Sequence, residues 1–192
     1  MAKVAIVYHS GYGHTARQAE HVKRGAESVA GTEVFFHPVE DFTEDYPGGA
    51  WADLNAADAI IFGAPTYMGS VSAPMKAFMD ASSKAWFTTA WADKLGAAFT
   101  NSGSQSGDKL NSLITLAVFG AQHGMIWVNL NMLPGNNNSK GSVDDLNRLG
   151  GFLGAMAQSN VDQGADGMRE SDLKTAEHLG RRVAEVATRF KG

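Results

Sequence analysis

The stretch that decides the fold is the apolar run KVAIV (3–7) together with YHSGYGHTARQAE (8–20), which follows it directly. An apolar run of this kind is typical of a buried parallel strand. It leads into a loop with two glycines, two hydroxyl residues and a histidine, and then into a helical pattern. A glycine-rich loop at this point is either a tight strand-to-helix turn or a cradle for a phosphate group.

The same alternation of strand and helix continues along the chain. The expected strands are 3–8, 32–36, 58–63, 95–100 and 125–130. Amphipathic helical patterns lie between them, the first over 14–30 and the last over 172–190. This order predicts an α/β fold in which helices cover both faces of a parallel sheet. For 192 residues we expect a doubly wound, five-stranded sheet of order 2-1-3-4-5.

Composition limits the possible functions. A chain of 192 residues is most simply a single domain over 1–192. It has no cysteine, so any redox chemistry must use a bound cofactor, and its six histidines show no metal-ligand spacing, so we predict no metal site. The net charge of -4, with both signs interspersed, argues against nucleic-acid binding. The first apolar stretch is too short for a signal peptide or a membrane span, so we expect a cytoplasmic protein without membrane insertion.

Three polar loops are expected to meet at one edge of the sheet. They read HSGYGHT (9–15), GAPTYMGS (63–70) and TNSGSQSGD (100–108). In the predicted strand order they follow three neighbouring strands, whose carboxyl ends form the crevice where such sheets bind ligands. Each loop combines glycine with hydroxyl or amide side chains. Together they predict a ligand that has both a phosphate and a ring with polar edges.

The first loop has three competing interpretations. Backbone N–H groups at a helix start bind anions without a lysine, and Ser10 and Thr15 add hydroxyl donors. A plain turn capped by one of these two side chains is the structural alternative. Gly11, Gly13 and Ala16 also fit a weak dinucleotide fingerprint, but no acidic residue closes the second strand and no G-K-[ST] follows. A mononucleotide phosphate is therefore the better fit.

With these loops in view, the chain resembles the flavodoxin superfamily, and more closely the WrbA-like NAD(P)H:quinone oxidoreductases, over nearly its whole length. The family's phosphate loop matches Ser10, Gly11, Tyr12, Gly13, His14 and Thr15. Its P-T-x-x-G loop matches Pro65, Thr66, Tyr67, Met68 and Gly69. Its third flavin loop matches Asn101, Ser102, Gly103, Ser104, Gln105 and Ser106. Its active-site tryptophan falls at Trp86, and its H-G-M motif begins at His123.

The resemblance implies a flavodoxin-like fold that binds FMN, with the phosphate on the first loop and the flavin ring between the second and third. It implies hydride transfer from NADH or NADPH to the flavin, followed by transfer of two electrons to a quinone-like acceptor. The resemblance also implies that Tyr12 and Trp86 contact the substrate and that Gln122 and His123 are catalytic. The resemblance also implies a homo-oligomer, a dimer or a tetramer, because a neighbouring subunit commonly completes the pocket wall in these proteins.

Three features depart from the family pattern. Gln122 occupies the place of the first of two consecutive histidines, and glutamine cannot carry a proton at neutral pH. The segment 37–57 is shorter than the family's insertion, and 129–160 replaces a familiar glycine-rich segment with a different one. Two other functions stay open: a one-electron carrier of the flavodoxin type, and an FMN-responsive protein that binds a partner through 131–142.

Overall fold

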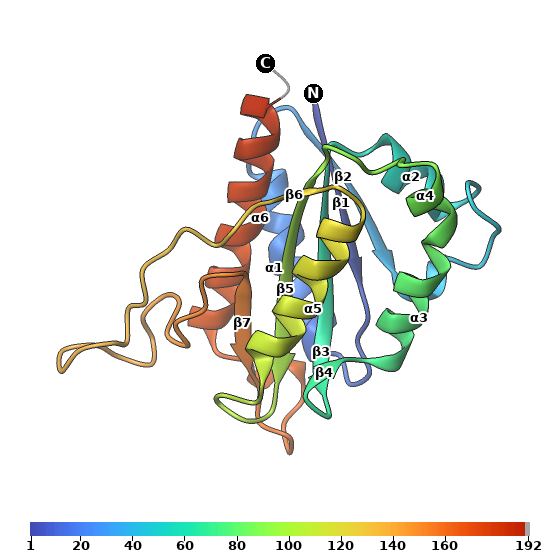
Figure 1. The fold of residues 1–192 in the computed structure, drawn as a ribbon. Helices are drawn as coiled ribbons and strands as arrows, with labels where there is room; N and C mark the ends of the chain where they lie inside the picture. Colours follow the sequence, from blue (N-terminus) through green and yellow to red (C-terminus); the bar gives the residue numbers. More distant parts are fainter. Residues whose placement is uncertain (191–192) are drawn as a thin grey trace.

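The structure is a computed structural model that describes residues 1–190 (Figure 1). Its strands are β1 (Ala2–Tyr8), β2 (Thr32–Pro38), β3 (Ala59–Tyr67), β4 (Ser70–Val71), β5 (Leu95–Ser102), β6 (Ile126–Trp127) and β7 (Ala155–Gln158). Its α-helices are α1 (His14–Glu27), α2 (Ala50–Ala56), α3 (Ala73–Ala81), α4 (Ser83–Phe87), α5 (Lys109–Gln122) and α6 (Glu170–Phe190). Two short 3₁₀ turns cover Val39–Asp41 and Ala165–Gly167.

The main sheet is parallel and confirms the predicted order. It runs β2-β1-β3-β5, and β6 and β7 both pair with the outer edge of β5, while β4 forms a small antiparallel hairpin with β3. β6 lies beside residues 95–96 and β7 beside residues 99–102. β6 and β7 thus share the place of one fifth strand, so the seven strands of the structure still form the expected 2-1-3-4-5 arrangement.

The prediction of one continuous fifth strand over 125–130 was wrong. Only Ile126 and Trp127 pair with β5 before the chain leaves the sheet, and it returns at Ala155. Asn131, which has a left-handed backbone with φ 46°, and Pro134, which lacks an N–H, both disfavour a continued strand. Figure 1 shows the excursion 128–154 extending away from the sheet beside α6.

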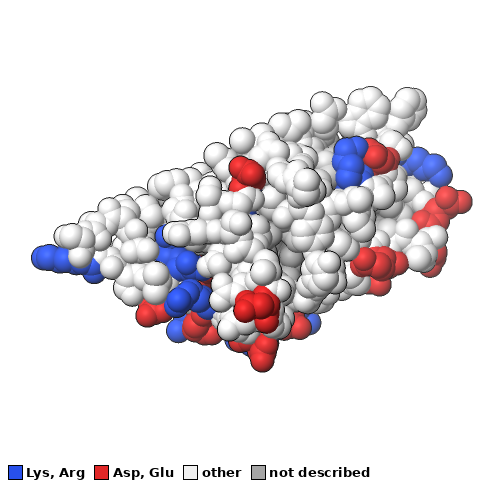
Figure 2. Space-filling model, turned by 90° about the horizontal axis from the view of Figure 1, so that it is seen from below, with Lys and Arg blue, Asp and Glu red and all other residues white. Residues whose placement is uncertain are grey.

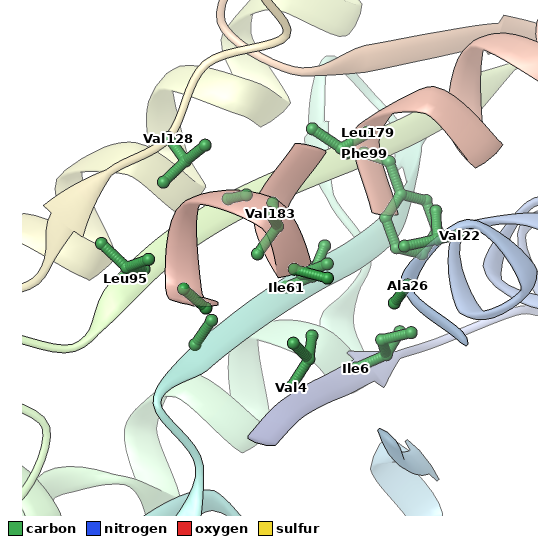
Figure 3. Close-up of a cluster of buried hydrophobic side chains, with 14 of the residues drawn as sticks. Val4, Ile6, Val22, Ala26, Ile61, Leu95, Phe99, Val128, Leu179 and Val183 are labelled. Carbon is green, nitrogen blue, oxygen red and sulfur yellow. The ribbon is translucent and has the colours of Figure 1, made fainter. Parts of the chain in front are cut away.

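Two apolar layers hold the helices to the sheet. On one face, α1 and α6 cover β1, β3 and β5 through the cluster drawn in Figure 3. Its labelled residues are Val4, Ile6, Val22, Ala26, Ile61, Leu95, Phe99, Val128, Leu179 and Val183. On the other face, α2 to α5 contribute a second cluster that includes Trp51, Phe78 and Leu116. The carboxyl ends of the parallel strands are left uncovered at one edge.

The packing of α1 against α6 depends on two glycines. A Cβ on Gly25 would overlap the backbone carbonyl of Glu177, and a Cβ on Gly180 would overlap that of Val22. The two helices therefore touch backbone to backbone, which fixes the position of α1 and hence of the loop that precedes it. Over the part of the chain that the structure describes, none of the helices combines the length and apolar character needed to cross a bilayer.

Candidate functional site

The carboxyl ends of four parallel strands line one cavity of about 640 Å³, within the size range of small-molecule sites. It is lined by Ser10, Tyr12, His14, Thr15, Pro65, Thr66, Tyr67, Asn101, Ser102, Gly103, Ser159, Asn160, Val161 and Gln163. The three polar loops expected from the sequence thus converge, as the strand order predicts. A fourth segment, which follows β7, completes the wall.

The first loop offers unpaired donors at the start of α1. Gly13, with φ 88°, is the N-cap, and no side chain caps the helix. The interpretation as a turn capped by Ser10 or Thr15 is therefore wrong. The Ser10 hydroxyl is buried and has no hydrogen-bond partner among the described residues. An uncapped helix start beside an unpaired hydroxyl has the donors that an anion requires.

The side chain of Thr66 in the second loop is fully used inside the protein. Its hydroxyl lies 2.9 Å from the Thr100 hydroxyl and 2.7 Å from that of Ser112. Thr100 in turn donates to the carbonyl of Ala64 at 2.7 Å. Thr66 therefore ties β3 to β5 and α5, and only its backbone and methyl group are free to contact a ligand.

Tyr67 connects the second loop to the first. Its hydroxyl lies so close to Gly11 that a Cβ there would be 2.6 Å from it, and its ring meets that of Tyr12 edge-on at 6.3 Å. Burial raises the pKa of the Tyr67 hydroxyl, so it stays protonated at neutral pH. Met68 and Gly69 follow with left-handed backbones of φ 48° and 83°. They form the tip of the hairpin, outside the cavity lining.

The third loop contributes its first half to the cavity. Asn101 is buried and donates to the Ser159 hydroxyl at 2.8 Å, while its Oδ1 has no partner among residues 1–190. Ser102 and Gly103 also line the cavity. The rest of the predicted set lies outside this cavity: Ser104 is not among its lining residues, and Gln105 and Ser106 line a separate groove beside α5.

The segment after β7, which was not predicted from the sequence, supplies Ser159, Asn160, Val161 and Gln163. This segment closes the wall against the first loop, because the backbone carbonyl of Gln163 lies 2.9 Å from His14 Nε2. The signal was present in GAMAQSN (154–160), a short apolar run followed by polar residues. This short run does not stand out as a strand, because 125–130 already accounts for the fifth strand in the predicted order.

Trp86, Gln122 and His123 lie elsewhere. They line a second cavity of about 510 Å³ between α3, α4 and the end of α5. The 14 residues of α5 span about 20 Å at 1.5 Å per residue, and the third loop is at the opposite end of this helix. The structure therefore does not bring these three predicted residues together with the three polar loops of the same chain.

His123 has the environment of a buried structural residue. Its Nε2 lies 2.9 Å from the hydroxyl of Ser82, which donates to the carbonyl of Met79 at 2.7 Å, so His123 must be the donor of the first bond. Its ring packs on Trp91 with centroids 4.3 Å apart. Burial lowers the pKa of His123 to about 4, so the ring is neutral at physiological pH.

A parallel sheet of this order, with a glycine-containing loop and an uncapped helix start at its switch point, is typical of a flavodoxin-like mononucleotide-binding protein. More particularly, the chain belongs to the NADPH-dependent FMN reductase family, whose model matches residues 10–136. This membership confirms the predicted class, an FMN-dependent oxidoreductase that uses a nicotinamide co-substrate.

Relatives and solved structures agree with this assignment. The chain is 43% identical over 186 residues to flavodoxin FldP of Pseudomonas aeruginosa, with 97% of each chain covered. It is 34% identical over 205 residues to quinone-oxidoreductase QR2 of Triphysaria versicolor, covering 98% of this chain and 97% of that one. A crystal structure of a WrbA-like flavodoxin from Agrobacterium tumefaciens matches with a TM-score of 0.75 and 41% identity over 98% of this chain and 99% of that chain. The predicted resemblance and fold are confirmed.

The cavity fits the cofactor that the family implies. FMN carries a terminal phosphate, and the uncapped start of α1 with the unpaired Ser10 hydroxyl suits an anion. The ring of FMN also carries an N–H donor, and the unpaired Oδ1 of Asn101, a residue of the cavity wall, is a buried acceptor. Ser10 and Asn101, which carry these two atoms, both line the same cavity, as a single ligand with these two ends requires.

Proposed function

We propose that this chain is a single FMN-binding domain that takes hydride from NADH or NADPH and passes two electrons to a quinone-like acceptor. The observation that carries the proposal is the convergence of the uncapped α1 start, Tyr67 and Asn101 on one cavity in a member of this reductase family. Several relatives at 30% to 32% identity are named NAD(P)H dehydrogenase (quinone), which supports this acceptor class.

Each loop holds a different part of the cofactor. Backbone N–H groups from Gly11 to Thr15, with the hydroxyls of Ser10 and Thr15, bind the phosphate. The backbone of residues 65–67 and the ring of Tyr67 lie along the flavin ring, and residues 101–103 surround its polar edge. Tyr12, which is 80% exposed at the cavity rim, is placed to contact the incoming substrate.

Bound FMN supplies the redox chemistry, and the protein supplies position and electrostatics. Stacking of nicotinamide and then of the acceptor over the open ring face is a proximity effect that needs no acidic side chain from this chain. Figure 2 views the molecule from the side of the carboxyl ends of the strands, and most of the surface in this view carries neither acidic nor basic side chains. An uncharged opening suits a neutral, planar acceptor.

A one-electron carrier is the second candidate, because the relative at 43% identity is named a flavodoxin. The two functions separate in an anaerobic titration of the FMN-loaded protein with NADPH and NADH. The proposal expects complete loss of oxidised-flavin absorbance in one two-electron phase and its return when benzoquinone is added. Failure of both nucleotides to reduce the flavin, with one-electron-reduced flavin accumulating under dithionite, would establish the carrier instead.

We also propose that the active unit is a homo-oligomer, a dimer or a tetramer, in which Trp86 and Gln122 serve a neighbour's flavin cavity. Their separation from the loops of their own chain supports this, as does the 50% exposure of Trp86. Two experiments test this proposal. Light scattering on the holoprotein measures the oligomeric state. In the second experiment, a Trp86→Ala variant is mixed with a variant that cannot bind FMN. Restored activity in the mixture supports a shared site, and a fully active monomer excludes it.

The lack of cysteine and the use of NAD(P)H support a cytoplasmic location.

A further inference from the structure

Lys109 is a buried cation directly behind the third loop. It is the first residue of α5 and only 1% exposed. Its Nζ donates to the Ser102 hydroxyl at 2.6 Å and to the backbone carbonyl of Ser104 at 2.7 Å. Lysine is almost never this buried unless it is paired. Because Ser102 lines the flavin cavity, the ammonium group lies one side chain behind the cavity wall.

The local backbone is shaped around this lysine. Gly107 and Asp108 have left-handed conformations, with φ 54° and 53°, which turn the loop back over the start of α5. A Cβ on Gly107 would overlap the Ser102 hydroxyl. Asp108 has a positive φ, which is unfavourable for a residue with a side chain, and its side chain does not cap α5. This tight return holds Lys109 beneath the loop.

The surrounding charges do not neutralise Lys109. Arg148, from the excursion 128–154, and Asp172, on α6, form a buried pair with contacts of 2.9 and 2.6 Å. That pair is neutral as a unit, and in residues 1–190 no carboxylate lies within ion-pair distance of Lys109. Burial lowers the pKa of Lys109 to about 8, with Asp172 opposing the shift and Arg148 adding to it. At pH 7 the group is still mostly charged, so the cavity wall has a net positive charge behind it.

We propose that Lys109 is an electrostatic positioning residue that makes the cavity bind reduced FMN more tightly than oxidised FMN. The inference rests on the proposed function. Hydride transfer delivers two electrons and one proton, so the ring gains one negative charge while the nicotinamide becomes NAD(P)⁺. A fixed positive charge in a poorly hydrated wall stabilises that added charge more than it would in water.

The expected effect is a shift in reduction potential. Each tenfold preference for the reduced over the oxidised form raises a two-electron potential by about 30 mV. A lysine that only held the loop in place would strengthen both forms equally and leave the potential unchanged. The potential therefore separates an electrostatic role from a structural one.

The test compares Lys109→Gln with the wild type at pH 7. Glutamine keeps a hydrogen-bond donor and removes the charge. Lys174→Gln, on the exposed surface of α6, is the control with the same change in net charge. The dissociation constant of oxidised FMN is measured by fluorescence, and the midpoint potential by titration against a reference dye. We expect the preference for the reduced form to fall at least tenfold in Lys109→Gln, about 30 mV, and to be unchanged in Lys174→Gln.

An unchanged potential in Lys109→Gln overturns the inference, even if both forms bind more weakly. If that variant does not fold, the wild-type potential is measured from pH 7 to 9.5. Loss of the lysine proton should then make the potential fall more steeply with pH than that of free FMN, and an equal slope rejects the proposal. Failure of the wild type to bind FMN would reject the proposed function itself, which is a different result.

Discussion

The hydroxyls of Thr66 on β3 and Thr100 on β5 lie 2.9 Å apart inside the protein, and Ser112 on α5 extends the chain of hydrogen bonds. This chain ends on the carbonyl of Ala64, so each hydroxyl has an acceptor for its hydrogen. It fixes the second and third loops relative to each other before any ligand binds.

Replacing Thr66 by Val should therefore destabilise the apoprotein. The substitution nearly keeps the shape but leaves buried hydroxyls of Thr100 and Ser112 short of a partner, which costs about 1–3 kcal/mol. Urea unfolding of the apoprotein measures this loss. Thr43→Val, at an exposed position, is the control and should change stability little. A Thr66→Val protein as stable as the wild type would show that the chain of hydroxyls is energetically unimportant.

Ser10→Ala should show the opposite pattern. The Ser10 hydroxyl has no partner within the described chain, so its removal should leave apoprotein stability unchanged or slightly increased. Loss of one donor to an anion should weaken FMN binding by about tenfold to a hundredfold, because hydrogen bonds to charged groups contribute roughly 1.5–3 kcal/mol. Thermal unfolding with and without FMN measures both quantities. Equal FMN affinity in the two proteins would remove Ser10 from the phosphate site.

The double variant Gly13→Asp with Thr15→Val should lose FMN and still fold. Aspartate at position 13 places a carboxylate beside the bound phosphate, and the left-handed backbone there costs about 1–2 kcal/mol for a residue with a Cβ. Gly13→Ala carries the same backbone cost without the charge, so it is the matched control. Circular dichroism checks the fold, and gel filtration of the loaded protein checks retention. Tight FMN binding by the double variant would mean that this loop is only a turn.

His123 should make the protein sensitive to acid. Its pKa of about 4 in the folded state is below the ordinary value of 6.5, so protons favour the unfolded chain. Its contribution is complete above pH 6.5 and is lost as the pH falls toward 4, by about 2 kcal/mol at pH 5. His21 and His178 also have pKa values lowered by burial, so the wild type and a His123→Gln variant will both weaken in acid.

The difference between the two proteins isolates His123. Urea midpoints at pH 7.5 and pH 5 should shift less in His123→Gln than in the wild type. An identical shift would mean that His123 is already protonated, or solvated, in the folded state at pH 5.

The parts of the fold that could be predicted are those specified by local sequence. Ile6, Ile61 and Phe99 belong to apolar runs that are buried on both faces, and such runs indicate parallel strands directly. The meeting of the three polar loops at one edge of the sheet could be predicted from the strand order alone. The fifth strand was predicted only in part, because β6 and β7 are short pieces that their common pairing with β5 identifies as one strand.

The candidate site was predicted less completely than the fold. The burial of Lys109 runs against the usual preference of lysine for water, and only the returning backbone at Gly107 and Asp108 explains it. Gln122 and His123 follow closely after the third loop in sequence, but the straight helix between them carries them to its far end. Sequence proximity is a poor guide to spatial proximity across a helix of this length.

The shared place of β6 and β7 on β5 has a practical consequence for engineering. Both ends of the excursion 128–154 are fixed to the same strand edge, so the sheet does not depend on the length of what lies between them. Its exposed stretch around Lys140 is a natural point to open the chain to new termini or to insert a reporter domain. A fusion made there would be anchored to β7, whose following residues line the cavity, and could report on flavin occupancy without replacing any residue of its wall.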